Sequence, residues 1–223
     1  MRGREGILRL SLAAVSLVLS LSGAAPVQAQ RIFLVGDSIS VSGIDELQAG
    51  TRSLPYRLQR AIPEKIVTLY GRPGWSMSYN SGYLVSQMSL EGLTAQLLAS
   101  DVVAILLGHN DFSASAPIAD FESSYLFALD NIRFWMGRPL CITPIPVQTE
   151  NSANRLGLTL EDYRESIRAV CTAAGIPVIE GPELIAYESR FYSDWNHLSL
   201  AGTRRLAKTL AQALRENVPE LSN

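Results

Sequence analysis

A serine in the first fifth of the chain has the setting of a catalytic nucleophile. Ser38 belongs to the tripeptide Gly-Asp-Ser, which ends a β-prone run that begins at Arg31. A β-prone run that breaks at a glycine is typical of a strand entering a turn, so we expect Ser38 just beyond the carboxyl end of a strand. In open parallel α/β sheets, ligands and reacting groups gather at that edge. Gly-Asp-Ser is also an ordinary turn sequence, so the tripeptide alone does not decide between catalysis and a turn.

A histidine with a neighbouring carboxylate lies near the C-terminus. Asp194 and His197 are three residues apart, just before an expected closing helix. This spacing lets the carboxylate hold one imidazole nitrogen while the other faces outward. A serine hydroxyl needs such a partner, because it is a weak nucleophile until a neutral histidine takes its proton. The alternative is a structural turn that contains a hydrogen-bonded histidine.

Two further turns contain groups suited to stabilising an anion. The first is Gly-His-Asn-Asp at 108–111, where the Asn110 side chain is a neutral amide donor. We expect Asp111 to be a structural hydrogen-bond partner for the loop, and we assign no chemical role to His109. The second is the glycine-rich turn at 71–76, where a glycine would let a backbone N–H approach the same anion. A plain turn glycine is the alternative there.

The elements that must position these residues alternate between strand and helix. We expect strands at 32–35, 66–70, 102–107, 139–144 and 177–180, and helices at 54–62, 83–99, 120–136, 159–174 and 200–215. Such alternation predicts a parallel sheet with helices on both faces. The expected fold class is α/β, a three-layer α/β/α sandwich whose five parallel strands take the flavodoxin-like order 2-1-3-4-5. Strands one and three are then neighbours, which would place Ser38 beside Asn110.

The N-terminal segment has the pattern of a secretory signal. Arginines precede an apolar core at 10–21, and Val-Gln-Ala at 27–29 has the small-x-small form of a cleavage site. We therefore expect residues 1–29 to be a signal peptide and 30–223 a single domain that is secreted or periplasmic. No stable membrane span is expected after its removal, and an uncleaved N-terminal anchor is the alternative.

The composition of the chain argues against nucleic acids and metal ions as binding partners. The chain carries a formal net charge of −2, and no block of lysine and arginine stands out, which argues against nucleic acid as a partner. The two cysteines, Cys141 and Cys171, could pair in an oxidising compartment or remain two buried thiols. Neither they nor the two histidines have metal-ligand spacing, so no metal site is expected.

Taken together, the four motifs resemble the SGNH hydrolases, also called the GDSL esterase/lipase family. The resemblance spans the whole domain and implies Ser38 as nucleophile, His197 as base and Asp194 as the residue that orients it. It also implies three oxyanion donors, which are the backbone N–H groups of Ser38 and Gly74 and the side chain of Asn110. Gly71 is a rival to Gly74, because Pro-Gly-Trp stands where the family more often has Ser-Gly and a polar residue.

The expected activity is that of an exported serine esterase without a cofactor or metal. Short connections suit a small acyl group, and Trp75 and Trp195 are candidate contacts for a sugar face, unless these rings belong to the core. A small-molecule or glycan ester, such as an O-acetylated carbohydrate, is the expected substrate. A lysophospholipase or thioesterase, a non-catalytic cell-envelope binding module and an acetyl transferase between sugars remain alternatives.

Overall fold

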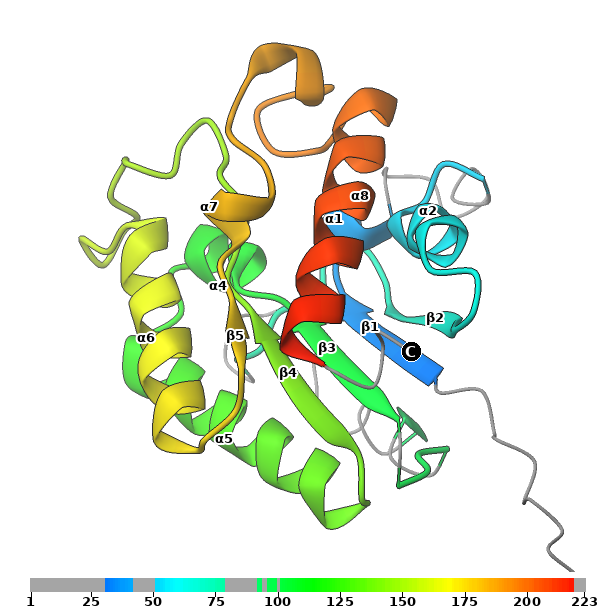
Figure 1. Ribbon diagram of the computed structural model, residues 1–223. Coiled ribbons are helices and arrows are strands. Elements are labelled where there is room, and N and C mark those ends of the chain that lie inside the picture. Colours follow the sequence, from blue (N-terminus) through cyan, green and yellow to red (C-terminus); the bar gives the residue numbers. More distant parts are fainter. Residues whose placement is uncertain (1–30, 42–50, 79–91, 94–95, 100, 219–223) are drawn as a thin grey trace, which may run out of the picture.

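A five-stranded parallel sheet forms the centre of the molecule (Figure 1). The computed structural model describes residues 31–41, 51–78, 92–93, 96–99 and 101–218. The strands are β1 (Arg31–Gly36), β2 (Ile66–Gly71), β3 (Val102–Leu106), β4 (Arg138–Ile142) and β5 (Val178–Ile179). Their order is β2-β1-β3-β4-β5, and each neighbouring pair is parallel. The expected strand order is confirmed.

Helices cover both faces of this sheet. The longer ones are α2 (Leu54–Ala61), α5 (Ile118–Phe134), α6 (Leu160–Ala173) and α8 (Leu200–Asn217). Successive side chains of a strand point to opposite faces, so Ile32 and Leu34 of β1 pack in the core beneath α2 and α8. Phe33 and Val35 pack in a second core with α5 and α6. The expected three-layer α/β/α sandwich is therefore confirmed, as Figure 1 shows.

Three short α-helices lie outside the helices that the sequence predicted. They are α1 (Ser38–Val41), α4 (His109–Ala114) and α7 (Gly181–Leu184). Each begins within three residues of the carboxyl end of a strand, β1, β3 or β5, so all three lie along one edge of the sheet. Most of the expected helix at 83–99 and the whole expected signal peptide lie outside the described residues. Within those residues, no helix is long and apolar enough to cross a membrane.

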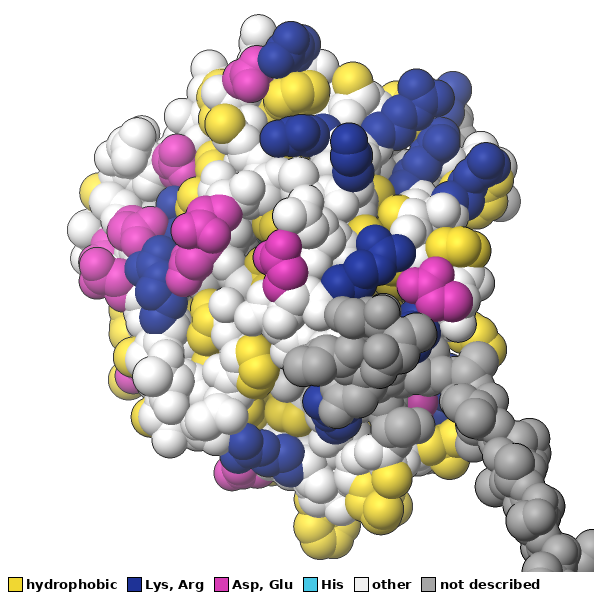
Figure 2. Space-filling model, in the orientation of Figure 1, with side chains coloured by type: hydrophobic (Ala, Val, Ile, Leu, Met, Phe, Trp, Pro, Cys, Tyr) yellow, Lys and Arg dark blue, Asp and Glu magenta, His cyan; other side chains and the backbone are white. Residues whose placement is uncertain are grey.

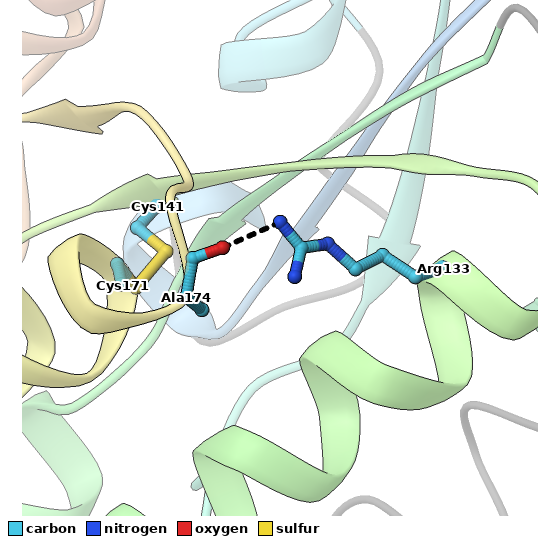
Figure 3. The surroundings of a disulfide bond; sticks show 4 residues. All are labelled: Arg133, Cys141, Cys171 and Ala174. Carbon is cyan, nitrogen blue, oxygen red and sulfur yellow. Dashed lines mark hydrogen bonds between the residues drawn. A yellow bond between two sulfur atoms is a disulfide. The ribbon is translucent and has the colours of Figure 1, made fainter.

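A disulfide bond joins the sheet to the helical layer (Figure 3). Cys141 near the end of β4 is bonded to Cys171 on α6. Beside it, the Arg133 guanidinium from the end of α5 donates a hydrogen bond to the carbonyl of Ala174, at 2.6 Å. The sequence left open whether the two cysteines pair or remain free thiols. In the structure they pair and link β4 covalently to α6.

Charged side chains are distributed unevenly over the surface. Figure 2 shows lysine and arginine gathered over α8 and α2, and acidic side chains gathered over α6. On α6, Glu161 forms ion pairs with Arg164 and Arg168, and Arg168 also pairs with Glu180 beyond β5. The basic surface collects residues from two helices that are far apart in the chain, which is why it is not visible as a block in the sequence.

Candidate active site

Ser38, His197 and Asp194 form one continuous hydrogen-bonded chain. Ser38 is the first residue of α1, and its Oγ lies 3.0 Å from Nε2 of His197. On the other side of the ring, Nδ1 lies 2.9 Å from Oδ2 of Asp194. A carboxylate accepts hydrogen bonds, so Nδ1 carries the hydrogen and Nε2 is left to accept from the serine hydroxyl. The fold thus brings together three residues that the sequence placed at opposite ends of the domain.

Asp194 also shapes the turn that holds His197. Its Oδ1 accepts the backbone N–H groups of Asn196 and His197, at 2.8 and 2.7 Å. Partial burial opposes ionisation of this carboxyl group, but these backbone bonds and the bond from the His197 ring outweigh burial and hold the pKa of Asp194 below its ordinary value. One carboxylate therefore serves both the turn and the imidazole.

Asn110 lies beside this chain of residues, on α4. Its Nδ2 donates to the backbone carbonyl of Trp75 at 2.6 Å and lies 3.5 Å from Oδ2 of Asp37. The register of β1 against β3 produces this proximity, because Gly36 pairs with Leu106, and the segments that follow carry Asp37 and Asn110. The expected neighbourhood of the first and third strand ends is therefore present.

The loop after β2 is fastened to α4 by the next residue. Asp111 is fully buried and accepts the backbone N–H groups of Met77 and Ser78, at 2.8 and 2.7 Å. Burial raises the pKa of Asp111 above its ordinary value, while these two backbone bonds oppose the shift. Asp111 is thus the structural partner for the loop that the sequence predicted.

The two candidate glycines of this loop have different environments. Gly71 ends β2 opposite Gly36 of β1, where a Cβ atom at Gly71 would lie 1.9 Å from the Gly36 carbonyl oxygen. Gly71 is therefore needed for close contact between two strands. Gly74 has a φ of 82° in the turn, and the next residue, Trp75, supplies the carbonyl that binds Asn110. Gly74 therefore belongs to the turn that contacts Asn110.

A second histidine, His109, and a further aspartate, Asp37, are buried beneath the site, and the sequence assigned a chemical role to neither. His109 Nε2 lies 2.8 Å from the carbonyl of Ile145, which can only accept, so Nε2 carries the hydrogen. Nδ1 has no hydrogen-bond partner in the described part of the chain and lies 4.0 Å from Oδ2 of Asp37. Asp37 Oδ1 accepts the backbone N–H of Ile39 at 2.9 Å.

Burial disfavours the charged forms of both groups. It raises the pKa of Asp37 to about 7, with a further contribution from the nearby charge of Asp111. Burial also lowers the pKa of His109 to about 4. The bond to the Ile145 carbonyl opposes this shift, and electrostatic interactions with Arg164 and His197 lower the pKa further. The one signal in the sequence was the position of Asp37 itself, a carboxyl group directly before the candidate nucleophile at the end of a buried strand.

These opposite pKa shifts predict that substitution of either residue changes how the free energy of unfolding depends on pH. Between about pH 4 and 6.5, native Asp37 keeps a proton that the unfolded chain has lost, and native His109 lacks a proton that the unfolded chain holds. The two contributions to the pH dependence of the unfolding free energy have opposite signs in the wild type, so they offset each other. Relative to the wild type, the unfolding free energy of Asp37→Asn should rise with pH, and that of His109→Gln should fall, each by up to about 1.4 kcal/mol per pH unit.

Urea unfolding at pH 4.5, 5.5 and 6.5 measures these slopes. The His109→Gln variant retains a side-chain donor for the Ile145 carbonyl, and Asp37→Asn retains an acceptor for the Ile39 N–H. Parallel pH profiles for the wild type and both variants would contradict the assignment of neutral buried forms.

The aromatic rings near this edge separate into buried and exposed groups. Phe112 and Tyr192 are buried, and Trp75 is half-buried against the ring of Tyr70, with ring centroids 5.7 Å apart. Trp195 is 49% exposed. Of the two tryptophans predicted to contact substrate, Trp195 is the one whose ring is open to solvent. In the described residues, no group of three or more His, Cys, Asp or Glu side chains could hold a metal ion.

Comparison with known proteins places the chain in a family. Residues 34–205 match the GDSL-like lipase/acylhydrolase family. Comparison with curated protein sequences gives no match. Among solved structures, the chain is similar to the lipase/acylhydrolase from Enterococcus faecalis, with 22% identity and a TM-score of 0.65 over 84% of this chain and 96% of that one.

Two esterases of known structure have the same fold. The psychrotrophic esterase EstA from Pseudoalteromonas sp. is 13% identical, with a TM-score of 0.67 over 87% of this chain and 100% of that one. The acetyl xylan esterase AlAXEase is 18% identical, with a TM-score of 0.63 over 82% of this chain and 99% of that one. At these identities the structural likeness shows a shared fold, whereas the family match spans most of the chain, from β1 into α8. The chain belongs to the GDSL-like lipase/acylhydrolase family and is an ester-bond hydrolase, as the resemblance of its motifs predicted.

Proposed function

We propose that this protein is an exported serine esterase that releases short acyl groups, in particular O-acetyl groups, from carbohydrate. The observation that carries the proposal is the hydrogen-bonded chain from Ser38 through His197 to Asp194. Ser38 Oγ attacks the ester carbonyl as His197 Nε2 takes its proton, and the imidazolium that forms faces the Asp194 carboxylate. His197 then returns the proton to the departing alcohol, and a water molecule activated by the same nitrogen releases the acid from Ser38.

The oxyanion of the tetrahedral intermediate requires donors that are already in place. We assign this role to the backbone N–H groups of Ser38 and Gly74 and to the side-chain amide of Asn110. An amide nitrogen has two hydrogens. The Trp75 carbonyl accepts one at 2.6 Å, and the other makes only a long contact of 3.5 Å with Asp37 Oδ2, which the oxyanion would replace. Gly74 is preferred to Gly71 because the latter is packed against the backbone of β1.

Loss of the Asn110 donor should therefore reduce turnover. We expect Asn110→Ala to lower kcat on 4-nitrophenyl acetate by about 10²- to 10³-fold with a much smaller change in KM, because the bond forms mainly in the transition state. Steady-state kinetics measure the two constants, and circular dichroism confirms folding. An unchanged kcat in a folded variant would exclude Asn110 as an oxyanion donor.

Carbohydrate is proposed as the alcohol part because of the exposed ring next to the catalytic carboxylate. Trp195 directly follows Asp194, and an exposed indole face is suited to the apolar face of a sugar ring. One protein with this fold is described as an acetyl xylan esterase, which supports a carbohydrate ester without identifying it. Lysophospholipase or thioesterase activity and a non-catalytic envelope module are the competing functions. Export is supported by the signal-like N-terminus and by the Cys141–Cys171 disulfide, which favours an oxidising compartment.

Hydrolysis of 4-nitrophenyl acetate, butyrate and octanoate tests the proposal. We expect kcat/KM to fall with chain length and Ser38→Ala to abolish activity on all three esters. A preference for octanoate would favour a lipid or thioester substrate, and activity on none of them would favour the binding module.

A further inference from the structure

A cavity of about 550 Å³ opens beside the proposed catalytic residues. Three segments form it, namely the end of α4, the loop after β4 and the segment that contains Asp194. The lining residues are Phe112, Ser113, Ser115, Thr149, Ser152, Ala153, Asn154, Arg155 and Trp195. Trp195 follows Asp194 directly, and Phe112 lies two residues beyond Asn110, so the cavity adjoins both the proposed triad and the proposed oxyanion donor.

Hydrogen bonds fasten the three segments to one another. The Asn154 amide donates to the Phe112 carbonyl at 3.1 Å, and the backbone N–H of Arg155 donates to Ser115 Oγ at 3.1 Å. The loop after β4 reaches the third segment through the Gln148 N–H, which donates to the Trp195 carbonyl at 3.0 Å. The cavity is therefore held in shape without a ligand, as binding sites usually are.

The lining groups define the chemistry of the occupant. The hydroxyl groups of Ser113, Thr149 and Ser152 make no hydrogen bond within the described part of the chain, and the Arg155 guanidinium forms no ion pair there. No acidic residue lines the cavity. A fatty acyl chain would remove water from these polar groups without replacing its hydrogen bonds, which costs free energy for each group. A sugar ring has an apolar face for Trp195 and hydroxyl groups at its edge for the serine and threonine side chains.

We propose that this cavity binds the alcohol part of the ester and that this part is a sugar unit bearing a negatively charged group, which Arg155 contacts while Trp195 stacks on the ring. The inference rests on the proposed esterase function and adds its substrate class. A carboxylate and a phosphate would present the same chemistry to a guanidinium, which forms paired hydrogen bonds with either. The cavity volume lies within the range of small-molecule sites and is large enough for a monosaccharide.

Acetate release from three matched substrates tests the inference. These are the 2,3,4-tri-O-acetates of methyl glucosiduronic acid, of methyl glucoside 6-phosphate and of methyl glucoside, which differ only in the charged group at C6 of the same sugar. We expect kcat/KM to be about tenfold higher for at least one charged substrate than for the neutral one, and Arg155→Gln to remove this preference. Preference for the uronate would identify a carboxylate, and preference for the phosphate would identify a phosphorylated sugar. A preference for the neutral triacetate, or equal values for all three, would overturn the proposal.

Two further variants separate the cavity from more general effects. Arg204→Gln removes the same charge from the exposed surface of α8, outside the cavity, and should leave the preference for charged substrates unchanged. A loss equal to that of Arg155→Gln would show that a general surface field, not the cavity, selects the charge. Trp195→Ala should raise KM for all three sugars more than it lowers kcat, and an unchanged KM would overturn the stacking role.

Hydrolysis of 4-nitrophenyl acetate by the wild type separates a failure of the charged-sugar inference from a failure of the proposed esterase function. If Ser38-dependent hydrolysis is present and charged sugars are not preferred, the substrate inference fails and the esterase function stands. If Ser38-dependent hydrolysis is absent with 4-nitrophenyl acetate and with all three sugar acetates, the esterase function itself fails.

Discussion

Replacing Ser38 by alanine is expected to lower kcat on 4-nitrophenyl acetate by about 10⁵- to 10⁶-fold, the largest effect of any single change in the chain. The reason is geometric, because Ser38 Oγ is the atom that His197 Nε2 faces at 3.0 Å. Without the hydroxyl, no acyl-enzyme forms, and only the oxyanion donors and substrate binding continue to assist attack by water.

Ser40→Ala is the matched control for this variant. Ser40 lies on the same short helix, is also buried, and has a hydroxyl without a hydrogen-bond partner in the described residues. Its loss should leave kcat within about twofold, because it contacts no group of the proposed mechanism. The double variant Ser38→Ala/His197→Ala should be about as active as Ser38→Ala alone, since the two residues act as a unit. Additive losses, or more than 1% residual activity in Ser38→Ala, would place the nucleophile elsewhere.

The strand order and the proximity of Ser38 to Asn110 were predictable, because both follow from the alternation of strands and helices along the chain. Strands joined by helices must be parallel, and right-handed crossovers leave few possible orders. The carboxyl ends of β1 and β3 therefore meet, and the residues after them lie within reach, as the register of Gly36 with Leu106 shows. The short helices α1 and α4 were not predictable, because four or six residues are too few to show a helical period.

Contacts between side chains in turns could not be predicted from periodicity. Nothing in the sequence indicates that the Nδ1 atom of His109 faces Asp37, or that Trp75 packs against Tyr70 while Trp195 stays exposed. Whether a side chain in such a turn is buried or exposed depends on the direction that the chain takes after its strand. A shift of the sequence by one residue would exchange the inward-pointing and outward-pointing side chains.

Arg164 is a similar case on a regular element. An arginine on an amphipathic helix is normally exposed, yet this one is buried on α6. It donates to the Pro144 carbonyl at 2.8 Å and pairs with Glu150 at 2.7 Å and with Glu161 at 3.0 Å. Glu150 belongs to the loop after β4, so Arg164 ties the loop that lines the proposed sugar cavity to the helical layer. Its burial depends on a partner in a loop, which the helical pattern does not encode.

Asp194→Asn is expected to lower kcat by about 10⁴-fold with little change in stability. Two backbone N–H groups, of Asn196 and His197, donate to Oδ1, so the oxygen of the new amide must occupy that position. Its NH₂ group then faces Nδ1 of His197 as a donor. The imidazole must present a lone pair there and carry its hydrogen on Nε2, where it points at Ser38 and cannot accept the serine proton.

This outcome distinguishes a catalytic role of the carboxylate from a structural one. Asp194→Ala removes the turn acceptor as well, so it should lower both kcat and the melting temperature, whereas Asp194→Asn should lower kcat alone. Measuring kcat together with thermal unfolding for both variants tests the distinction. If Asp194→Asn keeps near wild-type kcat, the carboxylate does not set the tautomer of His197, and the two hydrogen bonds to Oδ1 would then be its whole contribution.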